Sequence, residues 1–334
     1  MTAQKIKKNE LKQQDCIEQP APCATNAPTQ RATQELSQKH CGFVAVLGAP
    51  NAGKSTLVNL LVGAKVSIVS PKVQTTRSRV RGIVVQDNTE IILVDVPGIF
   101  KPKRRLDRAM VATAWTESED ADERLLLIDV KRGLDDDTKR IIDHLEKEKR
   151  PTILVLNKID TLPKEKLLPL IENLKSYQIF KETFCISAKT GENAKELLDY
   201  LVAQMPIGDF MYPEDNLSDL PNRLFCAEIT REKLYLNLQQ ELPYSVAVET
   251  TKFERNEAKG DIRVEQTIYV ERTGQKAIII GKGGKMLKKI GEATRYELSR
   301  IFECPVHVFL FVKVAQNWVN DPERYAEWGL DFNA

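Results

Sequence analysis

Eight consecutive residues form a pattern suited to binding phosphate. The run Gly48-Ala49-Pro50-Asn51-Ala52-Gly53-Lys54-Ser55 satisfies G-x-x-x-x-G-K-S/T, follows an apolar stretch and opens a helical pattern. Glycines let successive backbone N–H groups converge on phosphate oxygens, and the start of a helix adds partial positive charge. We expect Lys54 to reach the β- and γ-phosphates and Ser55 to ligate Mg²⁺. The motif indicates a nucleotide but does not say which one.

A second polar run favours guanine as the base. Asn157-Lys158-Ile159-Asp160 follows a short apolar stretch, where a parallel sheet binds ligands at its carboxyl edge. A carboxylate at Asp160 can accept from guanine N1–H and the 2-amino group, whereas adenine has no donor at either position. Asn157 would tie the loop down and the Lys158 stem would cover the ring. Ser187-Ala188-Lys189, after the next strand, could supply an N–H to the guanine carbonyl, although Ser187 could equally cap a helix.

A third run, Asp95-Val96-Pro97-Gly98, ends an apolar stretch between these two motifs. Asp95 is placed to join the Mg²⁺ shell, and the Gly98 amide is placed to sense the γ-phosphate. Each run alone is compatible with an ordinary loop. Three such runs in order after successive strands are a much stronger indication of a nucleotide site than any one of them.

The elements that must position these runs alternate in type from residue 42 to 205. Short β-branched runs separated by amphipathic stretches predict an α/β fold, with a mostly parallel sheet covered on both faces. Val80–Gln86 and Glu90–Val94 lie too close for a crossover helix and should form an antiparallel hairpin. The other expected strands are Phe43–Leu47, Arg124–Val130, Thr152–Leu156 and Thr183–Ser187, and the expected helices are Lys54–Gly63, Leu106–Ser118, Asp136–Lys149, Lys164–Tyr177 and Asn193–Gln204.

A second unit of different order follows a proline-containing connection, Pro206–Pro221. A helix, two strands, a helix, a glycine-rich loop, a helix and a last strand predict an α+β domain. The main expected ranges are Asn222–Gln240, Tyr244–Phe253, Ile262–Glu271, Lys285–Phe302 and Val306–Val314. Three aromatics after them, Trp318, Tyr325 and Trp328, are expected to pack on the sheet of this second unit.

The glycine-rich loop of the second unit has the form G-x-x-G. Gly281 and Gly284 would let the backbone approach a sugar–phosphate chain, and the next helix presents its N-terminus to phosphate. That helix is one-sidedly basic, with lysines and arginines at positions 285, 288, 289, 295 and 300. Alone, G-x-x-G occurs in any helix–turn–helix, so the order of elements around it carries the interpretation as an RNA-binding domain.

Composition limits the remaining possibilities. The 334 residues suggest two domains, and 49 basic against 47 acidic side chains leave a net charge of only +2, so any nucleic-acid surface is local. Three isolated histidines and six cysteines without Cys-x-x-Cys spacing disfavour a zinc site and a disulfide framework. No apolar run could span a bilayer and no signal peptide is seen, which predicts a soluble cytoplasmic protein. Residues 1–40 have the composition of a disordered extension.

The ordered motifs together resemble those of a translation-factor-class small GTPase, and three details narrow the resemblance to the bacterial Era family. These are the form Gly-x-Pro-Asn-x-Gly-Lys-Ser of the phosphate loop, the run Gln74-Thr75-Thr76-Arg77, and the second domain. The resemblance implies a P-loop GTPase domain of Ras-like fold with a six-stranded sheet at residues 41–206, a linker at 207–221 and a type II KH domain at 222–334. It also implies binding to the 3′ region of 16S ribosomal RNA and a role in maturation of the 30S subunit.

The resemblance assigns roles to individual residues. Lys54, Thr76 and Gly98 would be catalytic, and Ser55, Thr76 and Asp95 would hold Mg²⁺; the sequence does not separate Thr76 from Thr75. RNA would contact Ile280, Gly281, Lys282, Gly283, Gly284, Lys285, Lys288 and Lys289. GTP would contact Gly48, Ala49, Pro50, Asn51, Ala52, Gly53, Lys54, Ser55, Thr56, Asp95, Val96, Pro97, Gly98, Ile99, Asn157, Lys158, Ile159, Asp160, Ser187, Ala188 and Lys189.

The segment Val69–Arg79, called the switch segment below, would close over Mg²⁺ and the γ-phosphate and release after hydrolysis. Ile99 stands where Ras-like enzymes place a water-orienting glutamine, which predicts slow intrinsic hydrolysis. An asparagine at position 51 suggests a stimulating potassium ion. Arg77, Arg79 and Arg81 could act as an internal arginine finger, but we expect them to form surface ion pairs.

Three alternatives remain open at this level. The chain could be an ATP-using P-loop enzyme, against which Asn157–Asp160 argues. It could use its nucleotide only structurally, since the glutamine is absent. It could also be a GTPase that binds transfer or messenger RNA. The resemblance further implies a monomer that associates peripherally with the inner membrane, although no basic amphipathic helix supports this.

Overall fold

The computed structural model describes residues 38–334, apart from the side chain of Lys164. The extension expected to be disordered therefore lies almost entirely outside the described residues. Among the described helices, none is long and apolar enough to cross a membrane.

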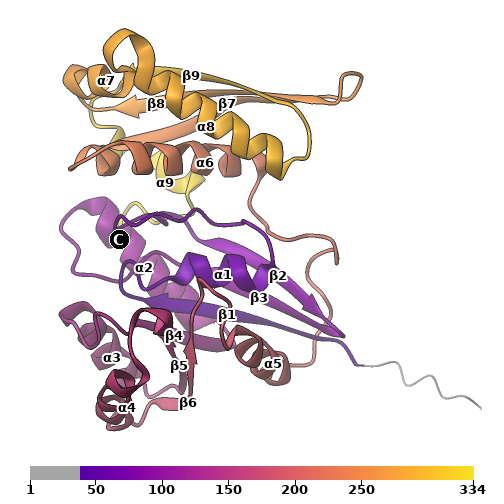
Figure 1. Cartoon of the computed structure of the whole chain (residues 1–334), viewed down its shortest axis with the longest axis vertical. Helices are drawn as coiled ribbons and strands as arrows, with labels where there is room; N and C mark the ends of the chain where they lie inside the picture. The colour runs from indigo at the N-terminus through magenta and orange to yellow at the C-terminus, as the bar shows by residue number, and fades with distance from the viewer. Residues whose placement is uncertain (1–37) are drawn as a thin grey trace, which may run out of the picture. The chain divides into compact units, whose positions relative to one another are not determined.

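The first half of the described chain forms a six-stranded sheet of order β2-β3-β1-β4-β5-β6 (Figure 1). All neighbouring strands are parallel except β2 and β3. These two are antiparallel, with Val80 opposite Asp95 at one end and Gln86 opposite Thr89 at the other, which confirms the predicted hairpin. The strands are β1 (His40–Gly48), β2 (Val80–Gln86), β3 (Thr89–Asp95), β4 (Glu123–Asp129), β5 (Thr152–Asn157) and β6 (Phe180–Ile186).

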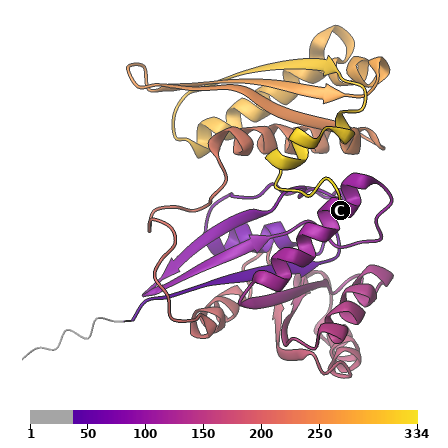
Figure 2. The same cartoon turned by 180° about the vertical axis from the view of Figure 1, so that it is seen from behind.

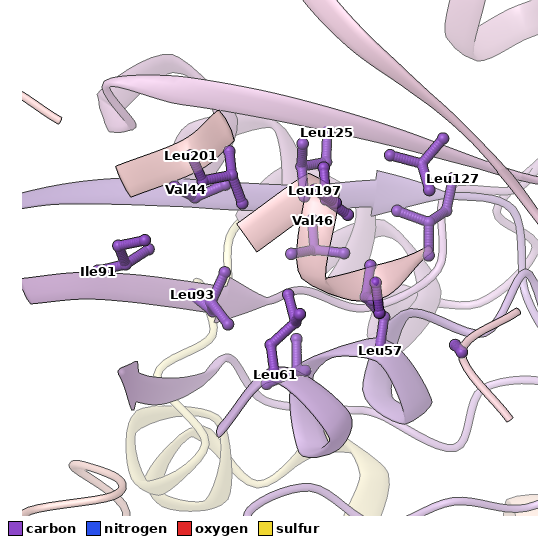
Figure 3. Close-up of a cluster of buried hydrophobic side chains, with 14 of the residues drawn as sticks. Val44, Val46, Leu57, Leu61, Ile91, Leu93, Leu125, Leu127, Leu197 and Leu201 are labelled. Atoms are coloured by element: carbon purple, nitrogen blue, oxygen red, sulfur yellow. The ribbon is translucent and has the colours of Figure 1, made fainter. Parts of the chain in front are cut away.

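Helices cover both faces of this sheet, as predicted (Figures 1 and 2). One core cluster joins Val44, Val46 and Leu93 of the strands to α1 and α5 (Figure 3). A second cluster on the other face joins the alternate strand residues, such as Ala45 and Leu47, to α2, α3 and α4. The helices are α1 (Lys54–Val62), α2 (Arg105–Asp120), α3 (Asp136–Glu148), α4 (Leu167–Lys175) and α5 (Ala194–Gln204).

The connection after α5 is held against the first sheet. The carboxylate of Glu90, fully buried in β3, accepts hydrogen bonds from the backbone N–H groups of Met211 and Tyr212 at 2.7 and 3.1 Å. The Cys41 thiol donates to the same carboxylate at 3.0 Å, and burial raises the pKa of that thiol to about 12. The connection is therefore bound to β3 at Glu90.

The second half has the predicted order of elements and forms a three-stranded sheet, β7-β8-β9, in which β8 and β9 run parallel. Its helices pack on one face, where Ile268, Ile279 and Ile290 are fully buried; the other face is seen in Figure 2. The elements are α6 (Asn222–Asn237), β7 (Val246–Asn256), β8 (Asp261–Val270), α7 (Thr273–Ile280), α8 (Lys285–Ile301) and β9 (Val306–Val314).

The C-terminal aromatics do not pack as predicted. Tyr325, in the short helix α9 (Pro322–Glu327), is fully buried in a cluster with Leu106, Ala109 and Met110 of α2. The expected packing on the second sheet was therefore wrong for Tyr325, because its ring packs on an apolar stripe of α2 instead. The guanidinium of Arg324 does reach that sheet, 4.1 Å from the centre of the Tyr269 ring.

Candidate functional site

The phosphate-loop motif forms the turn between β1 and α1. Gly53, the residue before α1, has φ +102°, which favours glycine. A Cβ atom there would lie 2.2 Å from Asn157 Nδ2, so a side chain could not fit. The loop thus borders a cavity of about 670 Å³, lined by residues of both the phosphate loop and the switch segment. A cavity of this size suits a nucleotide.

Lys54 lies at the base of this cavity and is only 6% exposed. Its ammonium donates to the carbonyl oxygens of Gly48 and Ala49 at 3.2 and 3.3 Å. Burial lowers the pKa of Lys54 to about 8, although the nearby Asp95 acts in the opposite direction. A buried ammonium that donates only to two carbonyls favours binding of an anion, because the anion would compensate for the hydration that burial removes.

Three oxygen-bearing side chains meet beside Lys54. Ser55 Oγ donates to Asp95 Oδ2 at 2.6 Å, and Thr76 Oγ1 lies 3.0 Å from Ser55 Oγ. Asp95 is fully buried, and its Oδ1 atom has no hydrogen-bond partner among the described residues. Burial raises the pKa of Asp95, while its bond to Ser55 lowers it. Two hydroxyls and an unsatisfied carboxylate oxygen fit Mg²⁺, which takes a few protein oxygens and keeps waters.

The structure distinguishes the two adjacent threonines of the switch segment. The hydroxyl of Thr75 turns away from the corner formed by Ser55 and Asp95 and donates to the carbonyl of Lys72 at 2.8 Å. Thr76 is the threonine beside Ser55. The sequence could not separate the two, because both hydroxyls lie in a loop without periodic structure.

Gly98 and Ile99 follow the buried aspartate and pack directly under the phosphate loop. A Cβ atom on Gly98 would lie 2.9 Å from Pro50 Cα, and the Ile99 N–H donates to the Gly48 carbonyl at 3.1 Å. The Ile99 side chain is buried in the core between the sheet and α2–α4. It therefore offers no polar group to a water molecule in the cavity.

Asn157 ties together three loops at the carboxyl edge of the first sheet. Its Nδ2 donates to the Ala52 carbonyl at 2.8 Å, and its Oδ1 accepts from the N–H groups of Lys158 and Ala188 at 2.8 and 2.9 Å. Asp160 is exposed, and its carboxylate accepts from Ser187 Oγ at 2.7 Å. One side chain thus places the phosphate loop, the 157–160 run and the 187–189 run against each other.

Asp129, at the end of β4, is a cavity residue that the sequence analysis missed. Its Oδ2 accepts from Lys158 Nζ at 2.6 Å, and Lys158 Nζ also donates to the Asn51 carbonyl at 2.7 Å. The signal was present, because Asp129 ends a strand on the same sheet edge as Asp95. Among the other predicted contacts, Pro50, Asn51, Thr56 and Gly98 line the cavity, and Lys189 is exposed. The cavity lining does not include Ala49, Ala52, Val96, Pro97 or Ile159.

None of the three candidate finger arginines makes a hydrogen bond to the phosphate loop. Arg79 pairs with Glu117 on α2, and Arg81 lies 3.8 Å from Asp219 in the connection, so these two form the expected ion pairs. Arg77 does not, because it is buried and contacts the second half of the chain. The expectation of a surface pair was wrong at that position.

The G-x-x-G loop lies between α7 and α8 with its polar groups exposed. Gly281, Gly283 and Gly284 have φ values of +72°, +60° and +76°, which glycine adopts without strain. Lys282, Lys285, Lys288 and Lys289 are exposed around it, while Ile280 is half-buried.

A groove of about 490 Å³ runs from this loop along α8 and β9. Of the predicted RNA contacts, Gly284 and Lys288 line it. The sequence analysis missed the strand side of the groove, Val308–Phe311, because a half-exposed edge strand looks like any other amphipathic strand. Phe309 and Phe311 remain 43% and 53% exposed, and the Arg263 guanidinium lies over the Phe309 ring at 4.7 Å from its centre.

Comparisons with known proteins agree with this division of chemistry. A family described as "50S ribosome-binding GTPase" matches residues 43–158, and one described as "KH domain" matches residues 241–319. The chain is 56% identical over 300 residues to the GTPase Era of Mesorhizobium japonicum, covering 90% of this chain and 96% of that protein. It is 53% identical over 298 residues to the GTPase Era of Brucella suis, covering 89% and 96%.

Two solved structures share the whole arrangement. One is Era in complex with MgGDPNP and nucleotides 1506–1542 of 16S ribosomal RNA, with a TM-score of 0.82 and 40% identity over 87% of this chain and 99% of that one. The other is an Aquifex aeolicus Era variant bound to GDP·AlF4⁻, with the same four values. The phosphate cavity, the G-x-x-G groove and these likenesses together establish that the chain belongs to the Era family of GTPases and carries a C-terminal KH domain.

Proposed function

We propose that this GTPase is a switch that binds the 3′ region of 16S ribosomal RNA through its KH domain and acts in maturation of the 30S subunit. The proposal rests on two sites in one chain. One is a cavity beside side-chain oxygens that fit Mg²⁺, and the other is the groove at the G-x-x-G loop. The relative solved with 16S ribosomal RNA supports the choice of RNA. The KH domain would take the RNA, and the nucleotide would control when it does so.

In the nucleotide cavity, Lys54 and the phosphate-loop amides would hold the phosphates, and Ser55, Thr76 and Asp95 would hold Mg²⁺. The metal would neutralise charge on the β- and γ-phosphates, so that water can attack the γ-phosphate. The Gly98 amide would report the presence of that phosphate. Ile99 supplies no side-chain base, so the rate would depend on Lys54, the metal and backbone dipoles, and turnover would be slow.

Guanine recognition can be tested at Asp160. In Asp160→Asn an amide N–H would face the donors of guanine, and GTP affinity should fall roughly 10²-fold or more, whereas xanthosine triphosphate, which carries an oxygen at position 2, should bind better. Ser187→Ala is the control, because it keeps the Asp160 carboxylate and removes the bond that orients it, together with one from the Thr190 N–H, and should cost less than tenfold. A variant at Asp160 that still prefers GTP would exclude this role. Competition with ATP in the wild type tests the adenine alternative.

The RNA proposal is tested with a labelled oligonucleotide that matches the 3′ end of 16S ribosomal RNA. Binding would be measured with GDPNP, with GDP and without nucleotide, and phosphate release from GTP would be followed with the RNA present. Tighter binding with GDPNP would support a switch. A transfer or messenger RNA bound more tightly than this oligonucleotide would contradict the proposed target.

A double variant identifies the surface used. Lys282→Asp with Gly283→Asp should weaken RNA binding without changing GTP affinity, because both residues are exposed and no atom lies within 4 Å of a Cβ placed on Gly283. RNA binding that survives this charge reversal would move the RNA site elsewhere on the protein.

The remaining assignments are also part of the proposal. A potassium ion near Asn51 is expected to stimulate hydrolysis; the Asn51 amide nitrogen donates to the Pro71 carbonyl at 2.9 Å, and the amide oxygen would be the atom that ligates the ion. Equal turnover in sodium and potassium buffers would exclude it. We also propose the domain limits 41–206 and 222–334, joined by 207–221, a monomeric state and a cytoplasmic location with peripheral association to the inner membrane, which cell fractionation would test.

A further inference from the structure

Arg77 occupies an unusual position for an arginine in a switch segment. It is only 4% exposed, and its Nη1 donates to the Val246 carbonyl at 2.7 Å. Its Nη2 lies 3.2 Å from both the Tyr235 hydroxyl and the Tyr244 carbonyl, and 3.4 Å from the Pro243 carbonyl. All four acceptors belong to the KH side of the chain. None of them is a carboxylate, so the hydrogen bonds of this buried charge all go to neutral oxygens, and the guanidinium also lies 5.9 Å from the centre of the Trp318 ring.

Such a set of contacts depends on the shape of the guanidinium group. Its planar fork presents donors in several fixed directions at once, which a lysine ammonium on a flexible stem cannot reproduce. Burial lowers the pKa of Arg77, but a guanidinium stays protonated in proteins. The charge must therefore remain in place and keep its carbonyl partners, because an unsatisfied buried charge is strongly unfavourable.

The residues before Arg77 are bound to the same helix. Tyr235 in α6 accepts from Arg77 and donates its own hydroxyl hydrogen to the Gln74 carbonyl at 3.2 Å. Arg231, one turn earlier on α6, donates to the Thr75 carbonyl at 2.6 Å. Tyr235 and Arg231 are themselves fully or nearly fully buried. The backbone on the N-terminal side of Thr76 is thus fixed to α6 as well.

Thr76 lies between Thr75 and Arg77, which are both bound to the KH side, but its own side chain contacts the nucleotide site. Its hydroxyl is 3.0 Å from Ser55 Oγ and 3.5 Å from Asp95 Oδ2, in the corner that fits Mg²⁺. Neighbouring Cα atoms are ~3.8 Å apart, so a shift of Arg77 must move Thr76. A single peptide unit therefore connects the KH domain to the metal corner.

We propose that Arg77 is a positioning residue for GTP binding and hydrolysis, which holds Thr76 at the Mg²⁺ corner by anchoring the switch segment in the carbonyl cage of the KH domain. The inference rests on the proposed roles of Thr76 and the metal corner. It means that the KH domain completes the GTP-bound form of the nucleotide site. GDP lacks the γ-phosphate over which the switch segment closes, so the affinity for GDP depends less on this anchor.

The test compares GDPNP and GDP affinities of the full-length chain with Mg²⁺, for wild type, Arg77→Lys and Arg77→Met. Both variants should lose about tenfold in GDPNP affinity, within the usual range for coupled sites, while GDP affinity stays within about twofold. A general loss of structure would weaken both nucleotides equally, and that result would overturn the proposal, as would unchanged GDPNP affinity.

Arg223→Lys is a matched control. Arg223 also donates to backbone carbonyls, those of Thr250 and Thr251 at 2.7 and 3.0 Å, but wholly within the KH domain. It should leave the ratio of the two affinities unchanged. A ratio that changes as much in this control as in Arg77→Lys would show that any loosened KH domain has the effect, and would contradict a specific role for Arg77.

A double-mutant cycle with Thr76→Ala separates this inference from the function on which it rests. If Arg77 acts through Thr76, then Arg77→Lys should have no further effect on GDPNP affinity once the Thr76 hydroxyl is gone. If Thr76→Ala alone leaves GDPNP affinity unchanged, the proposed metal role of Thr76 fails. If Thr76→Ala weakens GDPNP binding and Arg77→Lys adds its full effect to it, only the positioning role fails.

Discussion

At the scale of single residues, the Lys54 ammonium links nucleotide binding to pH. Burial lowers the pKa of Lys54 to about 8 in the free protein, and a bound polyphosphate should raise it, because an adjacent anion favours the charged form. Below pH 8 the lysine is already protonated, so affinity should not change with pH. Above pH 8 binding requires uptake of a proton, and affinity should fall by up to about tenfold per pH unit until the pKa of the bound form is reached.

This expectation is checked by titrating GTP affinity between pH 7 and 9.5 and by measuring proton uptake in two buffers of different ionisation enthalpy. The phosphate groups themselves titrate near pH ~6 and cannot produce a change above pH 8. Affinity that stays constant up to pH 9.5 would mean that Lys54 does not titrate in this range.

Single residues also show where sequence reasoning stops. The eight-residue phosphate motif and the 157–160 run were predicted because their spacing and their place after strands are local properties. The choice between Thr75 and Thr76 was not, since it depends on Ser55 and Asp95 approaching from other segments. Arg77 was expected at the surface, because no local pattern reveals that a charged loop residue will meet backbone carbonyls far along the chain.

At the scale of elements, two of the three glycines between α7 and α8, Gly281 and Gly283, should respond differently to substitution. A Cβ atom on Gly281 would lie 2.7 Å from Met286 Cβ, whereas one on Gly283 meets nothing within 4 Å. Gly281→Ala should therefore add steric overlap of about 1–3 kcal/mol to the cost of its backbone conformation, φ +72° and ψ 173°, which is essentially restricted to glycine and costs another residue about 1–3 kcal/mol. Gly283→Ala should incur only the left-handed backbone cost of roughly 1–2 kcal/mol. Thermal unfolding measures both, and equal destabilisation would show that the turn relaxes freely.

The bounds of the elements were predicted well where hydrophobic periodicity was strong. The strand predicted at Val306–Val314 has those bounds in the structure, and the helix predicted at Asn193–Gln204 begins one residue later, at Ala194. The helix predicted at Lys164–Tyr177 is shorter, Leu167–Lys175, and follows a separate 3₁₀ turn at Lys164–Lys166. The reason is local, because Pro169 has no N–H and is tolerated only in the first turn, where a start at Leu167 places it.

At the scale of the whole chain, the long-range packing of the C-terminal segment was the feature that sequence could not predict. The spacing of Trp318, Tyr325 and Trp328 predicted one short amphipathic helix, but only Tyr325 lies in α9, while Trp318 begins a separate 3₁₀ turn and Trp328 follows α9; both Trp318 and Tyr325 are buried. Their partner surface was not predictable, because amphipathic periodicity shows which face is apolar but not what covers it. The structure pairs that face with Leu106 and Met110 of α2, the helix that follows Gly98.

Tyr325 offers a direct test of whether the two halves of the chain behave as one cooperative unit. Its ring is fully buried beside Ala109 and Met110, so Tyr325→Ala should cost about 3–5 kcal/mol and should split one unfolding transition into two, as α2 loses contact with the C-terminal segment. Tyr325→Phe is the control, because the tyrosine hydroxyl has no hydrogen-bond partner among the described residues. That variant should unfold in a single transition at a similar or slightly higher temperature.

Differential scanning calorimetry of the three proteins, with and without GDP, distinguishes these outcomes. GDP binds only the nucleotide half and should raise only the first-half transition in Tyr325→Ala, but the whole transition in the wild type. Two transitions already present in the wild type would show that this interface does not unite the halves into one cooperative unit.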